Sequence, residues 1–130
     1  MTDMRSMFFD ASSFNQPIKM NTSQVTGMTF MFSGASSFNQ PITMDTSKVT
    51  TCRMSYMFDR ASSFNQPIKM DTSQVTDMRA MFYCASSFNQ PIKMDTSKVI
   101  NMEDMFKGAD AITKNKKAPS PVTKRVQEVN

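Results

Sequence analysis

Apolar residues recur along the chain at two spacings that predict two kinds of backbone. One stretch places four apolar side chains at i, i+3, i+6 and i+7, the spacing of a single helical face: Val75, Met78, Met81 and Phe82. A second stretch, Ile92-Lys93-Met94, alternates apolar, polar and apolar residues, which is the shortest pattern of a strand. The pattern therefore predicts a short amphipathic helix of two to three turns, followed by a short strand.

Capping and turn residues separate these two elements. Asp71 and Gln74 stand at the spacing of a capping box, so we expect the helix to begin after Asp71. Small residues at 85–87 predict a turn, after which Phe88 points inward. Pro91 fixes φ and lacks an N–H, so it should mark the start of the strand. Each unit is thus predicted to contain a strand, a turn, a short helix and a second turn.

This unit is written four times along the chain. The phrase ASSFNQPI begins at Ala11, Ala35, Ala61 and Ala85, and its phenylalanines stand 24, 26 and 24 residues apart. Such a period is typical of stacked coils that bury their apolar faces against one another. We therefore expect an α/β repeat solenoid, a right-handed stack of 24-residue coils like that of leucine-rich repeats. An all-β parallel solenoid is the alternative.

Stacking would align equivalent side chains in the interior. Ile18, Ile42, Ile68 and Ile92 are expected side by side in a parallel sheet. Two phenylalanine ladders are predicted: Phe14, Phe38, Phe64 and Phe88, and Phe8, Phe32, Phe58, Phe82 and Phe106. Asn15, Asn39, Asn65 and Asn89 should form a third ladder that satisfies backbone groups at a buried corner.

The repeat divides the chain into a body and a tail. The pattern decays after Phe106, which predicts a solenoid over residues 1–112 and an extended or disordered tail over 113–130. Residues 1–106 carry nine basic and nine acidic residues, whereas 107–130 carry six basic and two acidic ones, so the net charge of +4 lies in the tail. The body is therefore no basic nucleic-acid face, and the Pro-containing tail resembles a solvated linker.

Two irregularities accompany the repeat. Two extra residues near Thr51 and Cys52 should bulge from the start of the third helix or from the turn before it, because inside a helix they would rotate Phe58 out of the core. The chain also begins inside a repeat. This predicts a fragment of a longer array, or a coil whose uncapped end is covered in an assembly.

Composition argues against catalysis and against a cofactor. There is no His, which excludes the usual acid–base catalyst and His-ligated metals. Three glycines form no phosphate-binding loop. Fifteen methionines suggest a Cu(I) site, but their inward positions favour core packing. The two cysteines do not recur between repeats and suggest no disulfide or zinc site. We expect a protein that is not an enzyme and binds no metal.

The exposed face of the predicted strands is the candidate binding surface. One file of side chains points outward, and acidic residues follow it two positions later: Lys19, Thr43, Lys69 and Lys93, then Asp45, Asp71 and Asp95. The simplest interpretation of this file is a solvated face with surface salt bridges. Each such pair contributes little to the stability of the fold. The alternative is a repeated polar contact surface for a partner protein.

The phrase V-T-x-M-x-x-M-F-x-x-A-S-S-F-N-Q-P-I-x-M-D-T-S resembles the repeat of BspA-type leucine-rich-repeat surface proteins, the DUF285 group. Matching stretches begin at Val75, Met81, Ala85 and Asp95. The resemblance implies a short-stranded solenoid and an adhesive role on the cell surface or outside the cell. It implies no catalytic residues. One departure recurs in every coil, because a methionine stands where that repeat usually has tryptophan: Met20, Met44, Met70 and Met94.

Three functions follow as hypotheses. The first is a non-catalytic scaffold that binds proteins at a surface. The second is a structural subunit, packed in a larger assembly through its uncapped coil. The third and weakest is ice binding through a file of Thr22, Thr46, Thr72 and Thr96. No run approaches the length of a membrane span and no secretory signal is visible.

Overall fold

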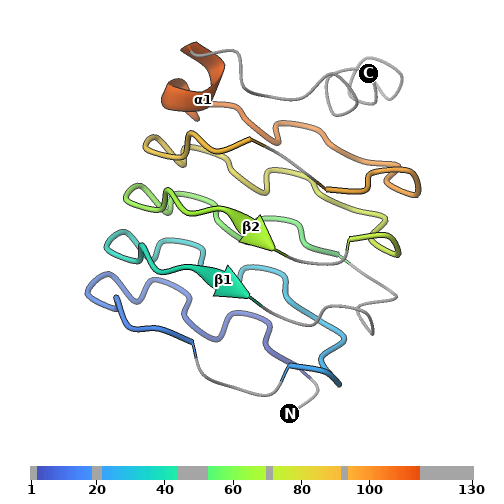
Figure 1. Cartoon of the computed structure of the whole chain (residues 1–130), viewed down its shortest axis with the longest axis horizontal. Coiled ribbons are helices and arrows are strands. Elements are labelled where there is room, and N and C mark those ends of the chain that lie inside the picture. The colour runs from blue at the N-terminus through green and yellow to red at the C-terminus, as the bar shows by residue number, and fades with distance from the viewer. Residues whose placement is uncertain (1–2, 19–21, 44–52, 70–71, 92–93, 115–130) are drawn as a thin grey trace.

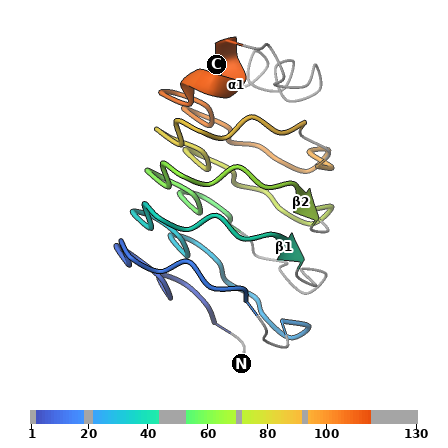
Figure 2. The same cartoon turned by 60° about the vertical axis from the view of Figure 1, so that its left-hand side comes forward.

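The computed structural model of the chain describes residues 3–18, 22–43, 53–69, 72–91 and 94–114. The chain winds repeatedly, and successive windings lie side by side along one direction (Figure 1). Two short strands, β1 (Ile42–Thr43) and β2 (Ile68–Lys69), pair in parallel with Ile42 opposite Ile68 and Thr43 opposite Lys69. Turned by 60°, the same windings show two layers of backbone (Figure 2).

One of these layers, which we call the turn layer, comprises residues 4–11, 28–35, 54–61, 78–85 and 102–109. Its N–H groups alternate between two kinds of partner. Every second N–H donates to the next winding, as those of Met54, Tyr56, Phe58 and Arg60 do to the carbonyls of Asp77, Arg79, Met81 and Tyr83 at 2.7 to 2.9 Å. The N–H groups between them donate three residues back, as from Met57 to Met54 at 3.2 Å. The backbone is thus satisfied partly within a winding and partly between windings.

The short helix predicted between Asp71 and Phe82 is wrong. The described residues 72–84 contain no helix: residues 73–74 and 79–84 form turns and Asp77 forms parallel bridges, and Ala80 and Cys84 adopt positive φ values of 52° and 56°. Positive φ at the third residue of a turn interrupts a helix. Spacing excludes a helix as well, because equivalent phenylalanine rings lie only 5.4 to 5.9 Å apart, whereas a helix is about 10 to 12 Å across.

The turns nevertheless bury the same side chains as the predicted helix. Val75, Met78, Met81 and Phe82 are all fully buried. Three-residue turns in succession return the chain to the same face at nearly the spacing of a helix, so the apolar pattern fits both backbones. The pattern identified the inward side chains correctly and the secondary structure incorrectly.

The core between the two layers is a double ladder of phenylalanines. Within a winding the two rings stack closely, as Phe58 does on Phe64 with centroids 4.3 Å apart. Between windings Phe58 lies 5.4 Å from Phe32 and 5.5 Å from Phe82. Phe38, Phe64 and Phe88 are fully buried, whereas Phe14 is half-buried. The ladder joins all windings into one apolar interior.

A short helix covers the last winding. Helix α1 (Asp110–Lys114) places Ile112 in the core, where it is fully buried. The helix includes Thr113 and Lys114, so these two residues do not belong to the extended tail predicted from 113 onward. Residues 115–130 lie outside the described part of the chain, as do Thr51 and Cys52 of the insertion.

Candidate functional site

The predicted strand face is represented by two described residues of its outward file. Because β1 and β2 pair in register, Thr43 lies directly beside Lys69, and both side chains are exposed. Their neighbours Ile42 and Ile68 turn to the interior, as alternation along a strand requires. Four other predicted members lie outside the described residues: Lys19, Lys93, Asp45 and Asp71.

Asp95 is exposed, and its carboxylate caps a turn rather than the predicted helix. Its Oδ1 accepts the N–H of Ser97 at 2.9 Å. Hydrogen bonding from Ser97 and the nearby Lys98 ammonium hold the pKa of the Asp95 carboxyl below its usual range. Lys98 donates to Gln74 of the preceding winding at 2.9 Å. A band of polar contacts therefore ties the edges of these two windings together.

The threonine file proposed for ice binding does not form a surface. Thr22, Thr72 and Thr96 are buried, with 5%, 2% and 8% of their surface exposed, and Thr46 lies outside the described residues. The hydroxyl of Thr72 donates to the carbonyl of Asp95 in the next winding at 3.0 Å. The Thr72 hydroxyl thus joins two windings, and because the described threonines of the file are buried, the prediction of an ice-binding face is wrong.

The asparagines form a ladder of side-chain to backbone hydrogen bonds. The N–H groups of Asn39, Asn65 and Asn89 donate to the Oδ1 atom of the asparagine one winding earlier at 2.8 to 2.9 Å. The neighbouring glutamines donate to the same oxygens at 3.1 to 3.2 Å. The carboxamide oxygens of Asn15, Asn39 and Asn65 thus each receive two donors from the following winding, which gives the ladder a structural role.

The turn layer also carries an outward column of side chains that the shared repeat pattern does not reveal. Each winding has two positions with positive φ, and the first of them forms this column: Ser6, Phe30, Tyr56, Ala80 and Asp104. Ser6 and Asp104 are exposed, Phe30 and Tyr56 are half-buried, and Ala80 is buried. Phe30 and Tyr56 stack with centroids 4.8 Å apart and planes 4° apart. Beside this stack lies a pocket of about 290 Å³ lined by Tyr56, Asp59, Arg60, Ala80, Tyr83 and Asp104. Aligning the repeats shows aromatic residues in this column, which was the available signal.

Charged groups extend from one rim of this pocket toward the earlier windings. Asp59 is buried and accepts from the Ser33 hydroxyl at 3.0 Å and from Arg60 Nε at 3.2 Å. The far end of the Arg60 guanidinium lies 4.0 Å from the carboxylate of Asp10, two windings away. Between these two groups lies Gly34, and the carboxylate of Asp10 occupies the space that a Gly34 side chain would take.

Other chemistry predicted from the sequence is sparse in the described residues. Nine methionines are buried in the core, among them Met28, Met31, Met78 and Met81. Cys84 is a free, half-buried thiol. Within the described ranges, no group of three His, Cys, Asp or Glu side chains could hold a metal ion, and no helix is long and apolar enough to span a membrane.

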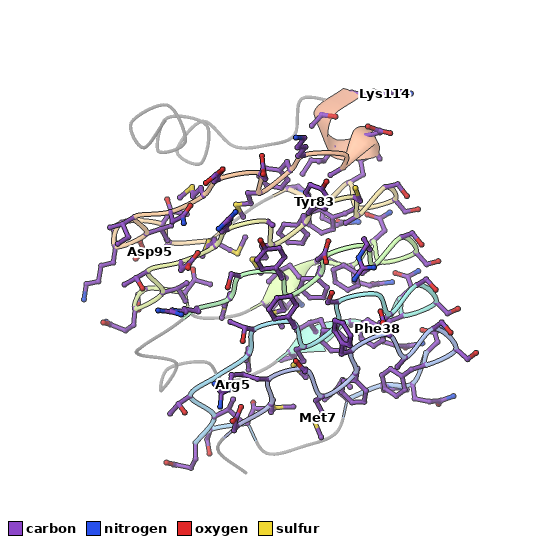
Figure 3. The ribbon with its side chains drawn as sticks, turned by 180° about the vertical axis from the view of Figure 1, so that it is seen from behind. Arg5, Met7, Phe38, Tyr83, Asp95 and Lys114 are labelled. Atoms are coloured by element: carbon purple, nitrogen blue, oxygen red, sulfur yellow. The ribbon has the colours of Figure 1, made fainter. Side chains whose placement is uncertain are left out.

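Figure 3 shows the turn layer from behind the view of Figure 1, with Tyr83 on this side and Arg5 and Met7 at its lower end.

A family model described as "Mycoplasma protein of unknown function, DUF285" matches residues 1–70. No curated protein and no solved structure matches the chain.

Proposed function

This chain belongs to the DUF285 family of Mycoplasma proteins of unknown function, and we propose that it acts as a non-catalytic repeat scaffold that binds other proteins. The observation that carries the proposal is the in-register pairing of β1 with β2. It sets exposed Thr43 and Lys69 side by side. An array of this kind suits contact with an extended partner, because equivalent groups repeat along it.

The proposal includes the fold class. We propose a parallel solenoid whose windings are strands and turns, the all-β alternative predicted from the sequence. It is supported by the parallel pairing of β1 with β2 and by parallel bridges that join Arg53 to Asp77 and Asp77 to Asn101. The close spacing of the windings favours it over the α/β arrangement of leucine-rich repeats.

The place of action follows from the resemblance to BspA-type proteins. We propose adhesion at a cell surface or outside the cell, with a partner protein as ligand and no enzymatic reaction. Lys69 on the strand face favours a partner whose contacting surface is acidic.

A second candidate is a structural subunit of a larger assembly. It is supported by apolar exposure at the first described winding, where Met7 and Phe9 are 40% and 45% exposed. The Phe8 and Phe14 rings of this winding are only half-buried, although they stack 4.2 Å apart. A partner packed against this winding would bury all four side chains.

An attachment assay tests the binding function. Beads coated with the purified chain should attach to cultured animal cells several times more often than albumin-coated beads. Lys69→Glu should reduce this attachment several-fold, because it reverses a charge on the strand face. The matched control is Arg79→Glu, which makes the same charge change at an exposed site in the turn layer and should attach like the wild type.

Circular dichroism must show that both variants fold like the wild type. Equal attachment by the Lys69→Glu and wild-type beads would exclude the strand face as the contact surface. The assembly candidate makes a different prediction, since it requires the chain to self-associate or aggregate through its first winding. A monodisperse monomer at high concentration, measured by light scattering, would contradict that candidate.

A further inference from the structure

The pocket beside Tyr56 lies where the outward column changes from aromatic to small side chains. Tyr56 stacks on Phe30 of the preceding winding at 4.8 Å. In the next winding the equivalent residue is Ala80, which lines the pocket and is only 2% exposed. Among the aromatic contacts of the described residues, Tyr56 stacks only on Phe30. The other face of its ring therefore borders the pocket.

The pocket lies where the next ring of the outward stack would stand. Phe30 and Tyr56 stack with centroids 4.8 Å apart, and successive rings of the core ladders stand 5.4 to 5.9 Å apart. A ring placed beside Ala80 would continue the stack of Phe30 and Tyr56 into the following winding. Tyr83 bounds the same pocket and adds a second aromatic contact. Offset stacking and edge contacts of this kind favour aromatic occupants over aliphatic ones.

Charge distinguishes the two sides of the pocket. The Arg60 guanidinium is directed to Asp59 and toward Ser33 and Asp10 of earlier windings, at 3.2, 3.5 and 4.0 Å. Asp104, on the opposite side, is exposed and takes part in none of the ion pairs between described residues. The open side of the pocket is therefore acidic and attracts a positive charge.

We propose that this pocket binds an aromatic side chain that stands beside a basic group on a partner protein. The ring stacks on Tyr56 over Ala80, and the cation lies against Asp104. The inference rests on the proposed protein-binding function and names the chemistry of one contact. It concerns the turn layer, a different surface from the strand face that carries Thr43 and Lys69, so either site can fail while the other stands.

The chain provides its own optical probe for this pocket. It contains two tyrosines and no tryptophan, and both tyrosines line the pocket. Tyrosine fluorescence of the full chain is therefore titrated with phenethylamine, which carries a ring and an ammonium group. We expect a saturable change with a dissociation constant on the order of 1 mM, as befits a ligand of so few atoms. A fluorescence change that is linear in phenethylamine, or absent, would overturn the proposal.

Two analogues separate the ring from the charge. Cyclohexylethylamine keeps the charge but lacks a planar ring, and it should bind at least about 10-fold more weakly. 2-Phenylethanol keeps the ring but lacks the charge, and its binding should be about 3-fold to 10-fold weaker. Equal binding of cyclohexylethylamine would contradict ring stacking, and equal binding of 2-phenylethanol would contradict the role of Asp104.

Filling the pocket with a ring from the chain itself is the decisive variant. Ala80→Phe introduces the residue that Phe30 already places at the equivalent position with a positive φ of 60°, so the backbone accommodates it. We expect unchanged or raised thermal stability and at least about 10-fold weaker phenethylamine binding. Unchanged phenethylamine binding by this folded variant would show that the proposed site is wrong.

Two further variants keep the test decisive if Ala80→Phe does not fold. Tyr56→Leu removes the stacking ring from a half-buried position and should also abolish binding, with Tyr83 as the remaining reporter. Asp104→Asn should lower phenethylamine affinity to that of 2-phenylethanol and leave 2-phenylethanol binding unchanged. If every variant binds phenethylamine like the wild type, the pocket proposal is wrong, whereas bead attachment through the strand face still stands or falls separately.

Discussion

The inner segment of each winding and its outer column follow opposite rules. The segment ASSFNQPI is identical in all four copies, and it supplies the buried alanine and phenylalanine and the asparagine ladder. The outer column changes at every winding, from Ser6 through Phe30, Tyr56 and Ala80 to Asp104. The identical segment contacts its own copies in neighbouring windings, whereas the column faces outward.

The identical segment holds the windings together, whereas the outer column makes each winding different from its neighbours. A residue that stacks on its own copy is restricted on both sides, because a change in one winding disturbs the windings before and after it. An outward position is free to vary, provided its residue tolerates a positive φ. We therefore expect substitutions in the identical segment to cost the most stability and those at outward positions to cost the least or even to stabilise.

Removing a central ring of the ladder should have the largest effect. Phe64→Ala removes a fully buried ring that contacts Phe38, Phe58 and Phe88, and should lower the free energy of unfolding by about 3 to 5 kcal/mol. Phe14→Ala is the matched control, because the Phe14 ring is only half-buried. This substitution should lower the free energy of unfolding by about half as much as Phe64→Ala. Urea denaturation measures both, and an equal loss would argue against a shared interior.

The asparagine ladder should give the next largest loss. Asn65→Ala removes the Oδ1 atom that accepts from the N–H of Asn89 and from the amide of Gln90, although Gln90 keeps the backbone carbonyl of residue 65 as an acceptor. Loss of the acceptor for the Asn89 N–H should cost about 1 to 3 kcal/mol. The adjacent Gln66→Ala removes only donors and leaves no N–H unpaired, so it should cost less than about 1 kcal/mol. The comparison fails if thermal unfolding shows the glutamine variant to be the less stable of the two.

The second positive-φ position of each winding in the turn layer offers a substitution that should stabilise the fold. Cys84 has a φ of 56°, and the equivalent residues Gly34 and Gly108 show what this backbone prefers. Cys84→Gly should raise the free energy of unfolding by about 1 kcal/mol. Cys84→Ala, which keeps a Cβ, should change the free energy of unfolding by only about a few tenths of a kcal/mol. Gly34→Ala should destabilise, since its Cβ would overlap the carboxylate of Asp10.

Acid should produce the smallest effect, at exposed carboxylates. Hydrogen bonding and the charge of Arg5 lower the pKa of Asp3 from 3.8 to about 2. Since the folded pKa is the lower one, the contribution of Asp3 is complete above about pH 4 and is lost as the pH falls toward 2. Asp3→Asn, which keeps the cap that Asn101 makes elsewhere, should remove this part of the pH dependence of the melting temperature. An unchanged profile would contradict the assignment.

Much of the interior could be predicted from the repeat, because equivalent residues of stacked windings must meet. The phenylalanine columns and the backbone role of the asparagines both followed from spacing alone, and membership of the DUF285 family, predicted from the motif, is confirmed by the match over residues 1–70. The helix could not be excluded by periodicity, since successive turns bury Met78, Met81 and Phe82 at helical spacing. Gly34 and Gly108 were the missed sign of positive φ.

The pocket was beyond sequence reasoning for a different reason. The pocket depends on which side chains of three successive windings meet on the outer surface. The shared repeat motif contains none of these variable positions, so it does not predict the pocket. Tyr56, Ala80 and Asp104 are informative because they differ. On the strand face the sequence predicted the outward file, and the structure places Thr43 beside Lys69, whereas four of its members lie outside the described residues.

The alternating N–H groups of the turn layer give the stack a direction. In every described interface of that layer, N–H groups of the earlier winding donate to carbonyls of the later one, as from Phe8 to Met31 and from Phe82 to Met105 at 2.9 Å. Within this layer, one edge of a winding therefore offers acceptors and the other offers donors, whereas in the asparagine ladder the later winding donates to the earlier one. If two copies of the chain meet through the turn layer alone, like edges cannot pair. Such a contact is head to tail, an arrangement that yields open filaments or rings and not two-fold symmetric dimers.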